Sequence, residues 1–322
     1  MRGQVNYRIG IDLLGSDLPA EQIAEAVFFY SQEWEGAVSL LLLATPELIR
    51  KLPPPSSSIS YYPVASAIQM DELPLEAIRN KKDSSLCAGV SLLKEGRLDA
   101  FISCGNTGAL IAETTLSLGL IGGVKRPAYL TLLPVQEGEM AVLDVGAMLK
   151  ADASRFVELG LMGAVYQRAR GIALPKVGLL NIGAEAQKGT IEHKEAYKQL
   201  QHLSENGKGF VFVGNVEGRD AFLGKVDVLV TDGFTGNVFL KTAEGVAAFL
   251  LNQVAALFGE KSSALRSRMH YTEHPGAVIC GVESLVIKCH GEGNPKSVVH
   301  SIRAAISLLN QDFLEKMRLL AK

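Results

Sequence analysis

Residues 226–237 read VDVLVTDGFTGN, and this stretch contains the step that decides the fold. Its first part, Val226 to Val230, is a short apolar run rich in valine, which favours a buried strand. From Thr231 onward small and polar residues replace the apolar ones, and a helix-length stretch follows over 236–258. A strand that leaves through Asp, Gly, Thr and Asn into a helix is typical of a parallel α/β sheet.

The same alternation of strand and helix runs along almost the whole chain. Short β-rich runs occur at 8–13, 38–43, 59–64, 99–104, 128–134, 141–146, 176–183, 209–214 and 226–232. Helix-length stretches occur at 84–96, 107–119, 154–170, 191–203, 236–258 and 295–319. Strands that are apolar throughout indicate a mainly parallel sheet with helices on both faces. The sequence therefore predicts a doubly wound α/β fold in one unit, residues 1–322, with a helical extension at about 245–273.

The composition is that of a globular chain without a strong charge preference. Among 322 residues, 32 are basic and 34 are acidic, so no net field draws the chain to nucleic acid or to an anionic bilayer. No apolar run reaches the roughly 18 residues that cross a membrane, and MRGQVNYRIGIDL at the N-terminus does not have the pattern of a signal sequence. We therefore expect a cytoplasmic protein that binds no nucleic acid.

Metal and cofactor motifs are missing from the sequence. The four cysteines form no C-x-x-C pair and lie in segments that indicate buried elements, so we expect reduced core thiols. His270 and His274 have the spacing of a helical metal pair, but no third ligand has a matching spacing. The first strand leads into DLLGSD rather than G-x-G-x-x-G, and no P-loop, G-x-S-x-G or H-E-x-x-H occurs. The sequence predicts neither a metal nor a nucleotide cofactor.

Polar loops follow several of the predicted strands. They read GNTGAL, AMLKAD, AEAQKGT, NVEGRD and TDGFTGN. In a parallel sheet the carboxyl ends of the strands share one edge, where ligands bind. Glycines allow close backbone approach, and free N–H groups at helix starts attract anions. The same residue types also form ordinary turns and helix caps, so each loop alone is ambiguous. Their recurrence at one edge predicts an anion site there.

Several motifs together resemble one family. These are IGIDLLGSD (9–17), RNKKDSS (79–85), ISCGNTGAL (102–110), VLDVGA (142–147), VGLLNIGAEAQKG (177–189), FVGNVEGRD (212–220), VDVLVTDGFTGNVFLKTAEG (226–245) and VIKCHGEGN (286–294). In this order they are similar to the phosphate acyltransferase family of bacterial phospholipid synthesis (PlsX). The resemblance implies transfer of a long fatty acyl group from acyl carrier protein to inorganic phosphate. It also implies a fold like that of phosphotransacetylases and isopropylmalate dehydrogenases, a homodimer, and a downstream acylphosphate:glycerol-3-phosphate acyltransferase as a partner.

The matched motifs supply the candidate site residues, because the reaction needs a phosphate site, oxyanion donors and a proton for the leaving thiolate. Predicted phosphate and oxyanion contacts are Asn106, Thr107, Asn215, Gly233 and Asn237, supported by Lys188 and Lys288. The carboxylates predicted to orient these donors are Asp12, Asp144 and Asp232. His290 is the predicted proton donor, since histidine changes charge near neutral pH. Each residue also has a plain structural explanation as a turn, cap or surface side chain.

Two further features each have two interpretations. Arg79, Lys81 and Lys82 form a basic cluster that either binds acyl carrier protein or phosphate, or is a solvated turn. Cys104 ends a strand beside GNTG and could be imagined as a nucleophile. The corresponding position in the family is commonly alanine, so Cys104 is predicted to be a core thiol.

The sequence departs from the family pattern at several positions. Ser16 stands where glycine is usual, Met148 where asparagine is usual, and Ala184 where an acidic or small polar residue is frequent. The segment between Lys241 and Gly276 is shorter than in many members, so peripheral contact with the inner face of the cell membrane is expected to be weak or absent. Two alternatives stay open: a short-chain phosphotransacylase that uses coenzyme A, and an inactive scaffold that binds acyl carrier protein.

Overall fold

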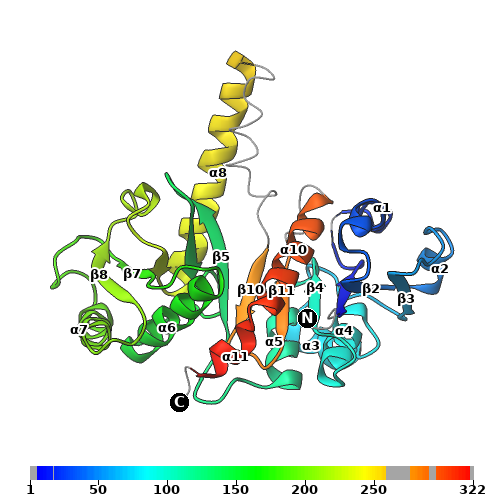
Figure 1. Cartoon of the computed structure of the whole chain (residues 1–322), viewed down its shortest axis with the longest axis horizontal. Coiled ribbons are helices and arrows are strands. Elements are labelled where there is room, and N and C mark those ends of the chain that lie inside the picture. The colour runs from blue at the N-terminus through cyan, green and yellow to red at the C-terminus, as the bar shows by residue number, and fades with distance from the viewer. Residues whose placement is uncertain (1–5, 17, 259–275, 290–294, 320–322) are drawn as a thin grey trace. The chain divides into compact units, whose positions relative to one another are not determined.

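The computed structural model describes residues 6–16, 18–258, 276–289 and 295–319. They form two compact units. Unit 1 contains residues up to 121, residues 125–127 and residues 275–310; unit 2 contains residues 122–124, 128–274 and 311–322. In each unit helices cover a mainly parallel sheet (Figure 1), which confirms the predicted doubly wound α/β class.

Unit 1 is built on a six-stranded sheet of order β3-β2-β1-β4-β11-β10. Its strands are β1 (Tyr7–Asp12), β2 (Val38–Ala44), β3 (Ile59–Pro63), β4 (Ala100–Ser103), β10 (Ala277–Cys280) and β11 (Leu285–Lys288). All neighbouring strands are parallel except β10 and β11, which are antiparallel. Strand β4 is buried along its whole length, because helices pack on both faces of it.

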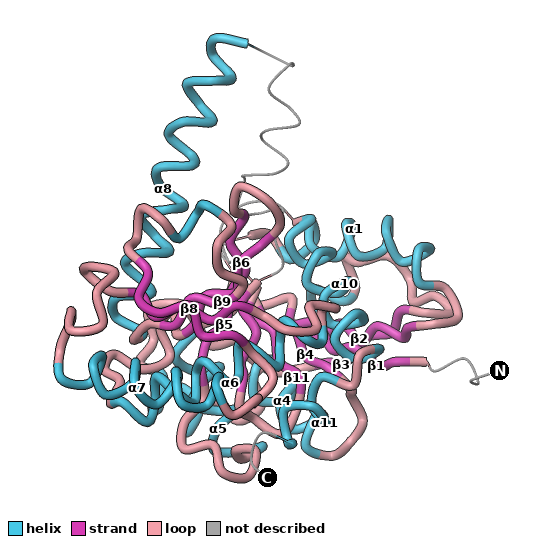
Figure 2. Tube along the Cα trace, turned by 60° about the vertical axis from the view of Figure 1, so that its left-hand side comes forward, coloured by secondary structure: helices cyan, strands magenta, loops and turns pink. Residues whose placement is uncertain are grey.

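The helices of unit 1 lie on both faces of this sheet. They are α1 (Ala20–Tyr30), α2 (Pro46–Ile49), α3 (Pro74–Asn80), α4 (Ser85–Lys94), α5 (Thr107–Leu118) and α10 (Lys296–Asn310), with the 3-10 turn η1 (Ser31–Trp34). Helices α1 and α10 cover one face, and α4 and α5 cover the other (Figures 1 and 2). Gly89 of α4 allows the close approach, since a Cβ there would overlap the ring of Phe101.

Unit 2 has a five-stranded sheet of order β5-β6-β9-β7-β8. The strands are β5 (Ala128–Pro134), β6 (Glu139–Leu143), β7 (Lys176–Leu180), β8 (Val211–Val216) and β9 (Val228–Val230). Strands β6, β9, β7 and β8 run parallel, whereas β5 and β6 form an antiparallel hairpin. The hairpin turns at Gly138, whose φ of 85° favours glycine.

Helices α6 (Ala153–Ala169) and α7 (Ile191–Glu205) pack together beside this sheet (Figure 2). Unit 2 also contains α8 (Gly233–Phe258), α11 (Phe313–Arg318) and the 3-10 turn η2 (Ala221–Leu223). Helix α8 starts next to β6, and its outer part extends beyond the sheet (Figure 1). None of the helices in the described residues combines the length and hydropathy that a membrane crossing requires.

The predicted elements differ from the structure mainly near the C-terminus. The stretch 295–319 was expected to be one helix, but α10 ends at Asn310 and α11 begins at Phe313. Asp312 between them has a φ of 51°, which is outside the helical region. The predicted extension at about 245–273 is described only as far as Phe258, where α8 ends.

Candidate functional site

The parallel strands of unit 2 bring four polar segments to one edge of the sheet. Strand ends β6, β9, β7 and β8 are in register, with Leu143 beside Val230 and Leu180 beside Val216. Five predicted residues follow the ends of β6, β7 or β9: Asp144, Lys188, Asp232, Gly233 and Asn237. A sixth, Asn215, lies in β8 next to its last residue. The sequence expectation that strand ends collect polar groups is therefore confirmed within this unit.

Asp144 is the centre of the tight turn after β6. It is almost completely buried, and its Oδ1 accepts hydrogen bonds from the backbone N–H groups of Tyr129, Gly146 and Ala147 at 2.9–3.1 Å. Its Oδ2 accepts from the N–H of Met148 at 2.8 Å. Burial raises the pKa of Asp144, while the amide bonds act in the opposite direction. The carboxylate thus fixes the backbone of the turn.

The turn after β9 starts helix α8. The Asp232 carboxylate accepts from the N–H of Thr235 at 2.9 Å and from its hydroxyl at 2.8 Å, which caps the first turn of the helix. The N–H of Gly233 donates to the Met148 carbonyl oxygen at 2.9 Å, so this amide joins the two turns. Asn237 is exposed on the first turn of α8, and its side chain lies beside Gly146. The two turns therefore form one packed structure.

The loop between β7 and α7, residues 181–190, is held by two asparagines. Asn181 Nδ2 donates to the carbonyl oxygen of Lys188 at 3.1 Å, and Asn215 Nδ2 donates to that of Glu185 at 2.8 Å. The Asn215 side chain is buried, and its Oδ1 has no hydrogen-bond partner among the described residues. Lys188 is exposed, and within the described part of the chain its ammonium has no ion-pair or hydrogen-bond partner. Its charge is free to meet an anion.

A cavity of about 620 Å³ lies between this loop and the starts of α7 and α8. Its lining combines apolar and polar side chains: Leu180, Ile182, Val238, Phe239, Asn181, Thr190, His193 and Thr235. The ring of Phe239 stacks on Phe222 with centroids 5.4 Å apart, which supports the apolar wall. Sequence reasoning missed Asn181, Thr190 and His193. A signal was available, since Asn181 lies inside the matched motif 177–189, Thr190 directly follows it and His193 is three residues further on.

In unit 1, β1, β4 and β11 also end side by side. The predicted residues Asp12 and Lys288 lie there on either side of Ser103. Ser103 is in register with both Asp12 and Lys288. The Asp12 carboxylate accepts from the Ser103 hydroxyl at 2.8 Å and from the N–H of Leu14 at 2.9 Å. Burial raises the pKa of Asp12, and the Lys288 charge opposes this effect. The Lys288 ammonium donates to the carbonyl oxygens of Cys104 and Cys289.

Asn106 is the N-cap of α5, and both ends of its amide are engaged. Oδ1 accepts from the N–H of Ala109 at 3.0 Å, and Nδ2 donates to the carbonyl oxygens of Gln69, Met70 and Glu72 at 3.0–3.1 Å. The side chain therefore ties the loop 69–72 to the helix start. Thr107, the first residue of α5, is half-buried beside it.

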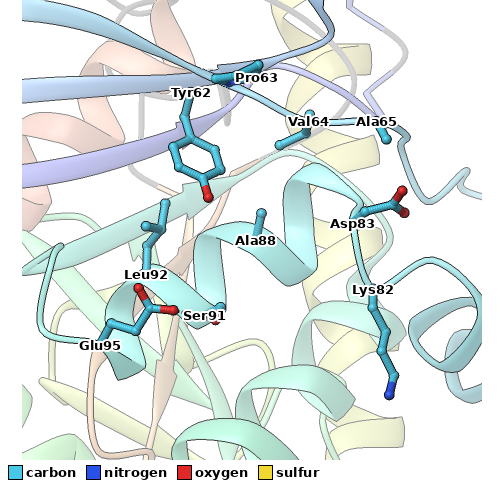
Figure 3. Close-up of a pocket in the computed structure, with 10 residues that line it drawn as sticks. All are labelled: Tyr62, Pro63, Val64, Ala65, Lys82, Asp83, Ala88, Ser91, Leu92 and Glu95. Atoms are coloured by element: carbon cyan, nitrogen blue, oxygen red, sulfur yellow. Dashed lines mark hydrogen bonds between the residues drawn. The ribbon is translucent and has the colours of Figure 1, made fainter.

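The basic cluster of unit 1 divides into two kinds of residue. Lys81 forms an ion pair of 2.7 Å with Glu72 and donates to the Ala67 carbonyl oxygen, so it stabilises the local fold. Arg79 and Lys82 are exposed. Lys82 lies at the rim of a cavity of about 390 Å³ between the end of β3 and α4. Figure 3 shows its side chain directed away from the other lining residues.

All four cysteines are free and buried, which confirms the prediction of core thiols. Cys104 and Cys289 are neighbours, because Cys289 N–H donates to the Ser103 carbonyl oxygen at the ends of β4 and β11. Hydrogen bonding with Cys289 and burial hold the pKa of the Cys104 thiol well above its ordinary value. A buried thiol with a raised pKa is a poor nucleophile.

Cys104→Ala is accordingly expected to leave turnover unchanged and to lower the free energy of unfolding by about 1 kcal/mol, as for a small core truncation. Initial rates and denaturant unfolding measure the two quantities. Intact-mass analysis of the wild type during turnover should find no acyl group on Cys104. A stable adduct on this sulfur would contradict the assignment.

Three histidines weighed in the sequence lie outside the described ranges. They are the predicted proton donor His290 and the pair His270 and His274, for which no metal was predicted. Within the residues that the structure describes, no group of three or more His, Cys, Asp or Glu side chains is arranged to hold a metal ion.

Comparisons with known proteins agree with this architecture. Residues 7–316 match the sequence profile of the family described as fatty acid synthesis protein. A phosphate acyltransferase from Chlamydia caviae is 38% identical over 97% of this chain and 98% of its own length. A phosphotransacetylase from Streptococcus pyogenes superposes with a TM-score of 0.65 at 16% identity, over 95% of this chain and 94% of that one. A 4-hydroxythreonine-4-phosphate dehydrogenase from Klebsiella pneumoniae has a TM-score of 0.56 at 12% identity, over 94% and 99%. At such low identity these two structural matches concern the fold alone.

Proposed function

This chain belongs to the phosphate acyltransferase family, and from that membership we propose that it transfers a long-chain fatty acyl group from acyl carrier protein to inorganic phosphate. The products are acyl phosphate and the free thiol of the carrier. The observation that carries the proposal is the loop 181–190: it presents the exposed Lys188 ammonium, and it borders the cavity of about 620 Å³, whose apolar side chains are Leu180, Ile182, Val238 and Phe239. A charge for phosphate and an apolar wall for an acyl chain are the two features that this reaction needs.

The reaction mainly requires that phosphate and the thioester be held in the right positions, because both groups are already reactive. Hydrogen phosphate is a nucleophile near neutral pH, and a thiol with an ordinary pKa of roughly 8.5 is a fair leaving group. Lys188 attracts phosphate, and Asn237 and Asn215 offer hydrogen-bonding groups at the same edge of unit 2. Asp144 and Asp232 hold the two turns in place. For unit 1 we propose that Lys288, Asp12, Asn106 and Thr107 support substrate binding at the carboxyl edge of its sheet.

One assay tests the proposal. Purified protein is incubated with an acyl carrier protein thioester, with and without inorganic phosphate, and thiol release is followed. Release that depends on phosphate and on the carrier supports the proposed function. Release only from short-chain acyl coenzyme A would instead identify a short-chain phosphotransacylase, and binding without release would identify an inactive scaffold.

Lys82 provides a test of the carrier as the donor. We propose that Arg79 and Lys82 meet the acidic surface of acyl carrier protein, because both are exposed whereas Lys81 is held by Glu72. Lys82→Glu is expected to raise KM for the carrier thioester about fivefold at low salt with kcat unchanged, since rim charges act mainly on association. The difference should shrink as ionic strength rises. An equal KM at all salt concentrations would remove Lys82 from the contact.

The remaining parts of the proposal concern the setting of the enzyme. We propose a cytoplasmic homodimer that passes its labile acyl phosphate to a glycerol 3-phosphate acyltransferase. Light scattering measures the dimer. Co-sedimentation with anionic lipid vesicles measures membrane contact, which is expected to be weak.

A further inference from the structure

His193 lies in the lining of the cavity of about 620 Å³ in unit 2. It stands on the first turn of α7, three residues after the N-cap Thr190. Leu180 and Phe239 contribute apolar wall to the same cavity, and Thr235 contributes a hydroxyl. Among the residues that line this cavity, His193 is the one whose charge changes near neutral pH.

The orientation of the imidazole ring follows from its neighbours. His193 Nδ1 lies 2.9 Å from Thr190 Oγ1. Interaction with the Thr190 hydroxyl also lowers the pKa of the Glu192 carboxylate. Because a carboxylate only accepts, we assign the hydroxyl hydrogen to Glu192 and the Nδ1–H to the bond with Thr190 Oγ1. The ring packs against Phe156 with centroids 4.7 Å apart. This leaves Nε2 unprotonated, and among the described residues it has no hydrogen-bond partner.

The surroundings also decide the charge of the ring. Burial lowers the pKa of His193 from its ordinary value, although Asp232 and Glu192 act in the opposite direction. These two carboxylates lie on the turn before α8 and on α7 itself, while Phe156 of α6 and Leu180 of β7 carry no charge. A neutral ring with an available Nε2 can accept a proton and can then return it.

We propose, on the basis of the proposed function, that Nε2 of His193 relays the proton of the transfer reaction from the attacking phosphate to the departing thiolate. Hydrogen phosphate carries a proton that the acyl phosphate product does not keep. As a phosphate oxygen bonds to the thioester carbonyl carbon, this proton moves to Nε2. The C–S bond then breaks, its electron pair stays on sulfur, and the thiolate takes the proton from the imidazolium. The products are acyl phosphate and thiol, and the ring is neutral again.

The position of His193 fits this task better than a purely structural role. The N-cap bond of Thr190 and the packing of Phe156 would hold the first turn of α7 without an ionisable group at position 193. The ring instead stands where the loop 181–190, which carries Lys188, and the apolar wall of the cavity meet, so a thioester in the cavity would lie beside it. The sequence assigns the proton to His290, and one experiment distinguishes the two histidines.

The experiment compares His193→Gln with the wild type on two donors, an acyl carrier protein thioester and an acyl thioester of an aryl thiol that is already ionised at neutral pH. With the carrier thioester, kcat is expected to fall about 100-fold, the lower range for general acid–base catalysis. With the aryl thioester the loss should be smaller, about tenfold, because this thiolate leaves without a proton and only the uptake of the phosphate proton is lost. An equal loss on both donors would overturn the proposal.

A second readout covers the case in which the wild type does not accept the aryl donor. The pH profile of kcat should change its shape in His193→Gln, whereas a merely structural loss would lower the profile without changing its shape. In His193→Ala, added imidazole should restore part of the rate, and no recovery together with an unchanged profile would count against the relay.

Matched variants complete the design. His202→Gln, on an exposed position of the same helix, should leave kcat unchanged on both donors. If His290→Gln rather than His193→Gln shows the loss that depends on the leaving group, the relay belongs to His290. Failure of the proposed function itself is seen separately, as the absence of phosphate-dependent thiol release by the wild type.

Discussion

Replacing Lys188 by alanine is expected to lower kcat at least about 100-fold while leaving the fold intact, as for removal of one preorganised donor to a developing negative charge. The structure explains why kcat should fall while the stability of the fold is kept. The loop that carries Lys188 is fixed by its backbone, through Asn181 to the Lys188 carbonyl oxygen and through Asn215 to that of Glu185. The ammonium is exposed and contributes to neither bond. Truncation therefore removes the charge and keeps the loop.

Steady-state kinetics with varied phosphate measure this loss, and thermal unfolding checks the fold. Lys194→Ala is the matched control, because Lys194 is an exposed lysine on the first turn of α7. It should retain the kcat of the wild type. If Lys188→Ala has nearly normal kinetics, Lys188 is not part of the phosphate site.

The fold was largely predictable because long apolar strands alternate with long helical stretches. Strands such as β2 and β5 are mainly apolar, and their bounds were predicted to within one residue. Strands β10 and β11 were not predicted as a pair, since each has only four residues and a short turn separates them. Their antiparallel pairing depends on tertiary contacts that local patterns do not contain. The break at Asp312 was missed for a similar reason, because its neighbours continue the helical pattern.

The sequence predicted at which edge of the sheet the site lies, but not which hydrogen bonds each side chain makes there. Strand order brings Asp144, Asp232 and Lys188 to one edge of unit 2, as the strand-end argument expected. The sequence does not tell which backbone groups a polar side chain will bond to. The hydrogen bonds by which Asn181 and Asn215 hold the loop 181–190 are therefore known only from the structure.

One departure from the family pattern also receives an explanation. Met148 stands where the family commonly has asparagine, yet two of its hydrogen bonds in the turn are made by its backbone. Its N–H donates to Asp144, and its carbonyl oxygen accepts from Gly233. A side-chain change at this position therefore leaves the hydrogen bonds of the turn available.

The turn after β6 packs against the start of α8, and Gly236→Ala is expected to disrupt this packing and to destabilise the protein strongly. A Cβ at position 236 would overlap the backbone carbonyl oxygen of Asp144 and lie 2.7 Å from Thr231 Cγ2. The carbonyl cannot move aside, because four N–H groups hold the Asp144 side chain of the same turn. We expect a loss of about 3 kcal/mol in the free energy of unfolding, the upper range for overpacking. The melting temperature should fall by roughly 6–12 °C for a unit of this size.

Calorimetry measures this fall, and Gly245→Ala on the same helix is the matched control. Among the described residues, no atom outside the adjoining backbone of the helix lies within 4 Å of a Cβ at position 245. Alanine favours a helix over glycine by roughly 0.5–1 kcal/mol. The same substitution should therefore stabilise the protein at one position of α8 and destabilise it at the other. Turnover should fall only in Gly236→Ala, because displacement of Asp144 also moves the start of α8 with Asn237. A Gly236→Ala protein as stable as the wild type would show that the turn after β6 and the start of α8 do not pack as described.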